Sequence, residues 1–497
     1  MSSVHAARRR QPETRVPWLP FAVGWALAAA AGPSALGAQV EPGRAALDRL
    51  AFEPLVFEQP EVEHHEIDGV RVLLLEDRDL PLVTVYAYVR GGYGLFERRL
   101  FAPALGLPAM LRYGGTETRT PGEVDDILER YAIQLAFGTA GGSVTSSINT
   151  LTEHLPLALE LWGDMLAHPR FDGAEIEAWR ARQLESVLRR ADDPARLAYS
   201  EINRLLFGDH PIGWEMDAED LAPEHLAPPA FHFLHRRILC RDNAILGVTG
   251  DASWVEVEGM LTALVQRLPA CLEPLPEGPT PEIRRAPGVF LIEKELDQSV
   301  VVMAHPTDVR LADDRTYYAA MTGNSILGGG GFSSRLLGRV RTEEGFAYSA
   351  ASLWTTPRQH EGIIGATTRT RPENTVPAIE LMLDIMEELR ASPPTREEVG
   401  TTVDRIVNGF VFNFDTPGQI VSRTMYYLAQ ELPEDWLERY WAGVQQVTPE
   451  DVRAVFAEHL RPRDMTILVV GDPRRIAADL ERLGPVTVLD PRRPSAR

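Results

Sequence analysis

The chain has 497 residues, enough for two large domains or three to four ordinary ones. Hydrophobic residues make up 44% of the sequence and charged residues 24%, a composition that excludes disordered and fibrous proteins. Fifty Lys and Arg residues against 71 Asp and Glu residues give a net charge of −21. Because this charge repels phosphate backbones and anionic lipids, we expect no nucleic-acid partner.

The first 38 residues have the pattern of an export signal. Four arginines precede the apolar stretch VPWLPFAVGWALAAAAG, which leads to the small-residue string SALGA. This pattern predicts a secretory signal peptide over residues 1–38 and a periplasmic or otherwise exported protein. An uncleaved N-terminal membrane anchor is the alternative, since the apolar run is close to the roughly 17 residues that span a bilayer.

The rest of the chain reads as two similar halves. Apolar runs follow Gly69 (GVRVLLLED, LPLVTVYAYVRGG) and Gly288 (GVFLIEKEL, SVVVMAHPTD), and each pair predicts a β-hairpin. The halves close with DNAILGVTGD and DMTILVVGDP, so that Asp251 and Asp472 lie 221 residues apart and the two glycines lie 219 apart. Such agreement predicts two homologous domains.

We place the domain boundaries from this repeat and from composition. The expected domains are residues 39–271 and 289–497, with a Pro-rich, charged linker at 272–288. A long surface loop within one domain is the alternative. Cys240 and Cys271, the only cysteines, can form one disulfide at most, and the sequence leaves open whether they do.

Inside each half, strands alternate with helices. PGEVDDILERYAIQL, from Pro121, predicts a helix that begins with proline and acidic residues. The small-residue strand GGSVTSSINTL follows, then an amphipathic helix that ends before Pro169, and ENTVPAIELMLDIMEELRAS predicts the matching helix of the second half. The predicted fold class is α+β, with antiparallel sheets covered by helices mainly on one face.

Three further segments carry a family resemblance: GGTETRT from Gly114, MLAHPRF, and SRLLGRVRTEEGFAYS from Ser334. With the element order above, the chain resembles the insulinase/pitrilysin family of zinc metallopeptidases, close to its processing-peptidase-like bacterial branch. The resemblance implies a clam-shaped arrangement of two halves. The N-terminal half would bring the zinc, and the C-terminal half would help to hold a substrate peptide.

The zinc motif of that family is missing. Its H-x-x-E-H helix places two histidine ligands and a general-base glutamate on one face. Counted from Gly115-Thr116, these positions fall on Gly106, Ala109 and Met110, and the stretch from Phe101 to Tyr113 contains no His, Glu, Asp or Cys. The third ligand position falls on Ser186, beside Glu185, which we expect to be a solvated helix residue. We therefore expect no metal in this chain.

Other histidines offer little replacement for the missing ligands. His64 and His65 are adjacent on a predicted strand and would point to opposite faces. His232 and His235, three residues apart on a predicted helix, could chelate in principle, but we interpret them as surface or packed residues.

The C-terminal half keeps a different part of the family machinery. Arg341 and Tyr348 match the Arg/Tyr pair of the family in type and in their spacing of seven residues. The resemblance implies that they hydrogen-bond the substrate and the oxyanion, which suits a permanent cation and a neutral donor. Arg335 and Arg339 are expected to be surface or structural residues. The motif GGGGF, ending at Phe332, lacks the Lys-Ser/Thr of a phosphate loop and is expected to be a flexible turn.

Some bacterial members of the family are heterodimers that divide the zinc helix and the Arg/Tyr pair between two subunits. The resemblance thus implies a non-catalytic, substrate-binding subunit of a hetero-oligomer, with zinc held by a zinc-bearing relative as partner. A peptide would add as a strand near Ala136, Phe137 and Gly138. The alternatives are an inert binding or assembly protein of the same fold, and a peptidase with an unrecognised metal site.

Overall fold

The computed structural model describes residues 61–490 of the chain. The predicted signal peptide lies outside the described residues. Within them, no helix is both long enough and apolar enough to cross a membrane.

The strands form two six-stranded sheets. The first has the order β1-β2-β6-β3-β5-β4. Its strands are β1 (Glu63–Ile67), β2 (Val70–Glu76), β3 (Leu82–Arg90), β4 (Gln134–Ala140), β5 (Ser143–Leu151) and β6 (Ala244–Gly250). The second has the order β12-β7-β11-β8-β10-β9. Its strands are β7 (Gly288–Glu293), β8 (Ser299–Thr307), β9 (Ala347–Trp354), β10 (Gly362–Thr370), β11 (Thr466–Gly471) and β12 (Val486–Val488). The α+β class with two sheets is confirmed.

Two expectations about the sheets are wrong. The predicted hairpins do not form, because the closing strand of each half inserts between the two strands of the expected hairpin: β6 pairs with both β2 and β3, and β11 with both β7 and β8. The sheets are also mixed rather than purely antiparallel, since β6 runs parallel to β2 and β11 parallel to β7. The long helical connections between these strands make such parallel pairing possible.

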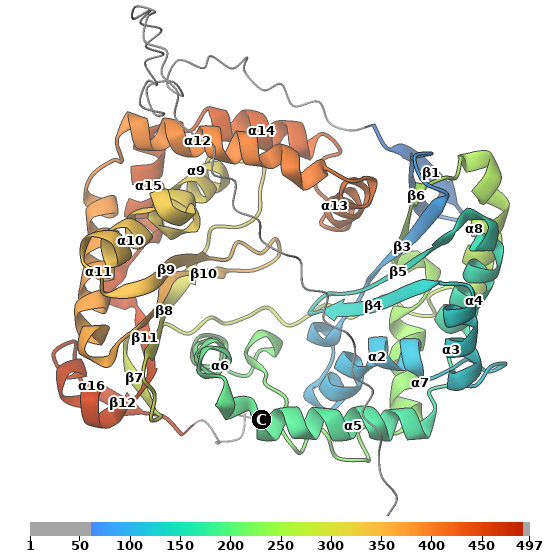
Figure 1. Cartoon of the computed structure of the whole chain (residues 1–497), viewed down its shortest axis with the longest axis horizontal. Coiled ribbons are helices and arrows are strands. Elements are labelled where there is room, and N and C mark those ends of the chain that lie inside the picture. The colour runs from blue at the N-terminus through green and yellow to red at the C-terminus, as the bar shows by residue number, and fades with distance from the viewer. Residues whose placement is uncertain (1–60, 491–497) are drawn as a thin grey trace, which may run out of the picture. The chain divides into compact units, whose positions relative to one another are not determined.

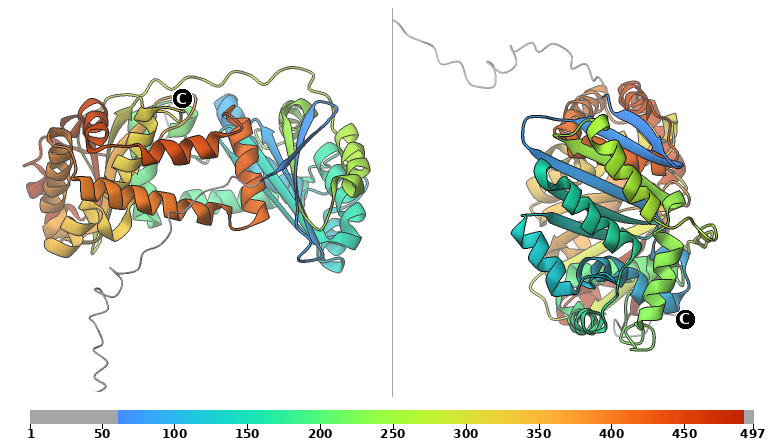
Figure 2. Two further views of the ribbon diagram at one scale, coloured as in Figure 1. Left: turned by 90° about the horizontal axis from the view of Figure 1, so that it is seen from above. Right: turned by 90° about the vertical axis from the view of Figure 1, so that its right-hand side faces the viewer.

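Helices cover the sheets, as Figure 1 shows for α3, α4 and α8 beside the first sheet. The right-hand view of Figure 2 shows helices of the N-terminal half lying over its strands. The helices of this half are α2 (Phe101–Tyr113), α3 (Pro121–Arg130), α4 (Leu155–Ala167), α5 (Gly173–Leu188), α6 (Pro194–Phe207), α7 (Pro228–Ile238) and α8 (Trp254–Arg267). Those of the C-terminal half are α9 (Arg315–Asn324), α10 (Arg335–Leu337), α11 (Thr375–Ala391), α12 (Arg396–Phe410), α13 (Pro417–Ala429), α14 (Trp436–Gln445), α15 (Pro449–His459) and α16 (Pro473–Leu480).

Helix α3 is shorter than the sequence pattern predicts. It starts at a capping box in which Thr120 and Glu123 exchange hydrogen bonds, but it ends at Arg130 instead of continuing to Leu135. Ala132 takes a positive φ of 51°, which turns the chain out of the helix, and β4 begins two residues later. Because Ile133 and Leu135 pack against the core from this new direction, tertiary packing overrides the helical spacing.

Each half lends one helix to the sheet of the other half. Helix α6 packs on β8 and β11, with Ile202 and Leu206 fully buried, and α13 packs on β2, β3 and β6. The approach of α13 depends on Gly247 of β6, because a Cβ there would lie 2.5 Å from a methyl carbon of Val421. Each sheet thus shares an apolar core with a helix from the other half, while the domain boundaries named above stay predictions.

Residues 268–287, between the two sheets, contain no helix or strand. A disulfide joins Cys240, after α7, to Cys271 at the start of this segment. It settles the pairing that the sequence left open and fixes the beginning of the connecting segment to the N-terminal half.

Candidate functional site

Helix α2 occupies the place of the missing zinc motif, and packing has filled that place. A Cβ on Gly106 would lie 3.1 Å from two carbons of the Trp179 indole, so this ring from α5 sits directly on the glycine. Met110 is completely buried and Ala109 half-buried. The three former ligand positions therefore belong to an apolar helix interface.

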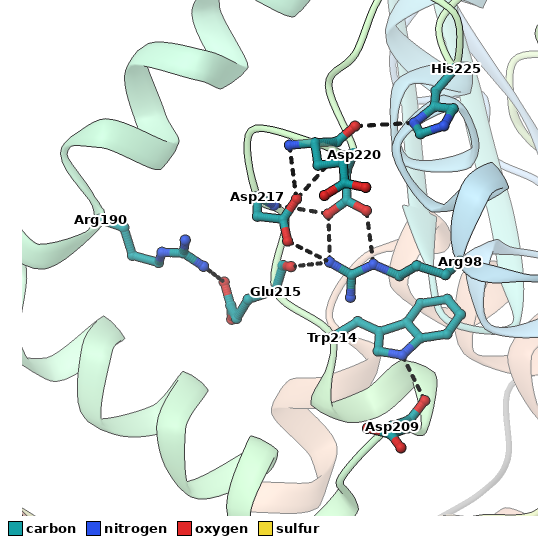
Figure 3. A network of polar contacts seen from close by, with 9 residues as sticks. Arg98, Arg190, Asp209, Trp214, Glu215, Asp217, Asp220 and His225 are labelled. Atoms are coloured by element: carbon teal, nitrogen blue, oxygen red, sulfur yellow. Dashed lines mark hydrogen bonds and ion pairs between the residues drawn. The ribbon is translucent and has the colours of Figure 1, made fainter. Parts of the chain in front are cut away.

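The residues around the start of α2 form a salt-bridged cluster, drawn in Figure 3. Arg98 Nε donates to Asp220 Oδ1 at 2.8 Å, and its Nη2 donates to the Glu215 carbonyl at 2.7 Å. The Arg98 guanidinium carbon also lies 5.3 Å from the centre of the Trp214 ring and 5.0 Å from that of Phe101. Most polar groups of this cluster are bonded within it, as in a structural ion-pair network, while Arg98 Nη1 is buried without a hydrogen-bond partner in the described residues.

The third ligand position is also unsuited to a metal. Glu185 is exposed and pairs with Arg189 at 2.9 Å, one helical turn along α5. Ser186 lines a cavity of about 240 Å³ together with Phe101 and Leu105. No cluster of three His, Cys, Asp or Glu side chains that could hold a metal ion occurs between residues 61 and 490.

The remaining histidines are explained by packing. His235 is buried and its Nε2 lies 2.7 Å from the Leu166 carbonyl oxygen, to which it donates as a neutral ring. Burial lowers the pKa of His235 to about 4 and also lowers the pKa of His232. His65 stacks on Trp254 with ring centres 3.7 Å apart, and the adjacent His64 is exposed.

Arg341 and Tyr348 are brought together at the edge of the second sheet. Arg341 lies on the π-helical turn Gly338–Glu343, and Tyr348 is the second residue of the edge strand β9. The guanidinium carbon is 4.4 Å from the centre of the Tyr348 ring, and Tyr348 is 77% exposed. The guanidinium carbon also lies 4.9 Å from the ring centre of Phe332, for which the sequence pattern predicts only a flexible turn.

The neighbouring arginines behave differently. Arg335 makes two hydrogen bonds to the Glu398 carboxylate, at 2.8 and 2.9 Å, and Arg339 makes two to Glu388. The Arg341 side chain has no ion pair or hydrogen bond within the described part of the chain. The segment therefore presents one guanidinium whose charge and N–H donors are available.

Ala136, Phe137 and Gly138 lie on β4, the edge strand of the first sheet. Ala136 pairs with Ser147 and Gly138 with Thr145. All three residues line a cavity of about 510 Å³, whose other walls are Tyr86, Tyr88, Met425 and Tyr426. The last two come from α13, so this cavity exists only because the C-terminal half places a helix over the first sheet.

Comparisons with known proteins show similarity to peptidase-family sequences. Residues 231–406 match the family model described as the peptidase M16 inactive domain. An uncharacterized zinc protease of Streptomyces coelicolor is 23% identical over 370 residues, 73% of this chain and 79% of that protein. A non-peptidase homolog, YmxG, of Helicobacter pylori is 20% identical over 420 residues, 83% of this chain and 94% of that protein.

Solved structures share the fold. A peptidase M16 inactive domain from Pseudomonas fluorescens superimposes with a TM-score of 0.74 at 24% identity, over 83% of this chain and 98% of that one. The periplasmic protease PqqL of Escherichia coli gives 0.70 at 13% identity, over 85% of this chain and 48% of that one. The chain is thus similar to insulinase-like proteins of the M16 peptidase family, and its helix α2 lacks the zinc motif of that family.

Proposed function

We propose that this protein is the non-catalytic, substrate-binding subunit of a heteromeric, exported zinc metallopeptidase, in which a zinc-bearing relative supplies the metal. The observation that carries the proposal is the environment of the Arg341 side chain. Its guanidinium stands beside the exposed Tyr348, without a carboxylate partner in the described residues, while α2 offers no zinc ligand. A pure assembly protein would gain nothing from such an arrangement.

The chemistry of the pair suits peptide hydrolysis. Attack of water on a peptide carbonyl places negative charge on its oxygen, and donors that are already oriented toward that charge lower the barrier. Arg341 is permanently cationic and Tyr348 carries a neutral O–H donor. Both could donate to a carbonyl or an oxyanion held in the partner's active site.

A path for the peptide is supported by β4. As an edge strand it has backbone groups available to an added strand, which is a common mode of peptide recognition. Ala136 and Gly138 carry almost no side chain, so a peptide backbone could approach closely, with a side chain entering the cavity beside Tyr86 and Tyr88.

Export is supported by the signal-like N-terminal sequence and by the disulfide between Cys240 and Cys271, since disulfides persist in oxidising compartments. The periplasm is therefore the proposed location. Zinc belongs to the proposed partner, and the proposed assembly is a hetero-oligomer with peptide as its substrate.

The test is reconstitution. Peptidase activity on an unstructured peptide library is measured with this chain, with a co-expressed zinc-motif relative, and with both together. We expect activity only in the mixture, and a loss of about 100-fold with Arg341→Ala, the size typical of removing one oxyanion donor. Arg339→Ala is the matched control, because Arg339 is already paired with Glu388. Full activity of the relative by itself, unchanged by this chain, would instead favour the assembly protein.

A further inference from the structure

The glycine-rich segment before α10 carries an aromatic residue that the proposed function does not use. Phe332 is 75% exposed, yet its ring centre lies 4.9 Å from the guanidinium carbon of Arg341. An arginine over an aromatic face is attracted by the ring electrons. Arg341 therefore contacts two exposed rings: Phe332, which precedes it in the chain, and Tyr348, which follows it.

The backbone around Phe332 is held in place. Gly331 has a φ of 66°, a conformation that favours glycine. Arg405, from α12, donates to the Gly330 carbonyl at 2.8 Å and to Ser325 Oγ at 2.8 Å. Ser334 Oγ donates to the Gly331 carbonyl at 2.6 Å. The segment is thus anchored on both sides of Phe332, in contrast to the flexible turn that the sequence predicts.

The arginines between Arg335 and Arg341 are restrained in two different ways. Arg335 and Arg339 are restrained by carboxylates, which neutralise the charge and occupy N–H donors. Aromatic rings restrain a guanidinium by attraction to the ring face, without neutralising its charge. Arg341 is held in this second way.

We propose that Phe332 is a positioning residue that, with Tyr348, holds the Arg341 guanidinium in place while leaving its charge and N–H donors available to a bound polypeptide. What the guanidinium then binds rests on the proposed function. The contact itself is a property of this chain and can be tested without a partner.

The first experiment uses the purified chain by itself. Arginines are labelled with phenylglyoxal and the rates at Arg341 and Arg339 are followed in the same digest by mass spectrometry. Phe332→Ala should speed labelling of Arg341 about threefold and leave Arg339 unchanged, since an exposed cation–π contact has roughly that strength. Phe332→Tyr should keep the wild-type rate. Phe412→Ala, at a residue that is 68% exposed, is the matched control and should change neither rate. An unchanged Arg341 rate in Phe332→Ala would overturn the proposal.

The second experiment uses the reconstituted mixture. Phe332→Ala should lower kcat/KM about threefold, Phe332→Tyr should restore it, and Phe332→Ala should add nothing in an Arg341→Ala background. An equal loss in both backgrounds would show that Phe332 acts independently of Arg341 and would refute the positioning assignment. If the wild-type mixture is inactive, the proposed function fails, while the labelling rates still decide the positioning assignment.

Discussion

Helix α2 and the segment from Phe332 to Tyr348 lie beside the edge strands of the two sheets, β4 and β9, and they present opposite kinds of surface. On α2, Gly106 and Met110 are packed among apolar side chains and the nearest charged groups are paired with each other. On the other segment, a guanidinium and two aromatic rings stay exposed. The α2 face is packed into a core, whereas the other segment keeps charged and aromatic groups in contact with water.

The difference follows from the cost of each arrangement. Once the polar ligands at an interior helix face are replaced by small or apolar residues, the neighbouring Trp179 can pack there, and close packing then penalises any return of polar groups. An exposed cation has no such consequence, because water solvates it. Packing around α2 therefore opposes a metal site there, whereas an exposed Arg341 places little demand on the fold.

The largest effect is expected when the zinc motif is rebuilt on α2. The triple variant Gly106→His, Ala109→Glu, Met110→His should lose at least about 3 kcal/mol of unfolding free energy, because it places polar groups in a closed interface. It should also bind no stoichiometric zinc. Urea unfolding and metal analysis measure both quantities.

The matched control places the same residues at the same spacing on the exposed side of α12, as Glu397→His, Gly400→Glu and Thr401→His. This variant should stay within about 1 kcal/mol of wild type. A stable α2 variant with one zinc per chain would contradict the view that packing has closed the site.

Lowering the pH should reduce the stability of the packed cores, because each core contains a buried histidine. Burial lowers the pKa values of His235, in the N-terminal half, and His305, in the C-terminal half, to about 4 from 6.5. The unfolded chain takes up protons first, so the stability that these neutral rings provide is complete above pH 6.5 and is lost as the pH falls toward 4. At pH 5 each should have lost about 2 kcal/mol.

Urea unfolding from pH 7 to pH 5 measures this loss. His235→Gln should remove about half of the pH dependence, because His305 still titrates, whereas His64→Gln, at an exposed position, should retain it in full. Equal pH dependence in His235→Gln and wild type would show that the buried ring does not titrate as inferred.

The smallest expected effect is on the exposed edge. Arg341→Ala should change the unfolding free energy by no more than about 1 kcal/mol, because its two ring contacts are exposed and it has no charged partner in the described residues. Arg335→Ala, which removes a two-fold hydrogen bond to Glu398, should cost more. A loss above 1 kcal/mol in Arg341→Ala would mean that the guanidinium stabilises the fold and would weaken the proposed role in substrate binding.

Much of this architecture could be predicted from the sequence, because strands and helices leave local periodicities. The amphipathic helices before Pro169 and over Thr375–Ala391 form as their spacing predicts. Strand pairing was harder to predict: nothing local in DNAILGVTGD shows that it inserts between two strands that are nearly consecutive in sequence. The sequence carries no local signal for the role of Phe332, because its segment is anchored by Arg405 from α12, far along the chain.

Residue types and their spacing are readable in the chain: α2 carries no metal ligand, Arg341 and Tyr348 lie seven residues apart, and apolar strands come in two similar sets. The surroundings of these residues depend on the tertiary fold. It packs Trp179 on Gly106, places α13 over the first sheet to form the cavity at β4, and leaves Arg341 with two rings and no carboxylate in the described residues. The reason is physical: ligand identity is a local property of a residue, whereas burial and charge pairing depend on segments far apart in the chain.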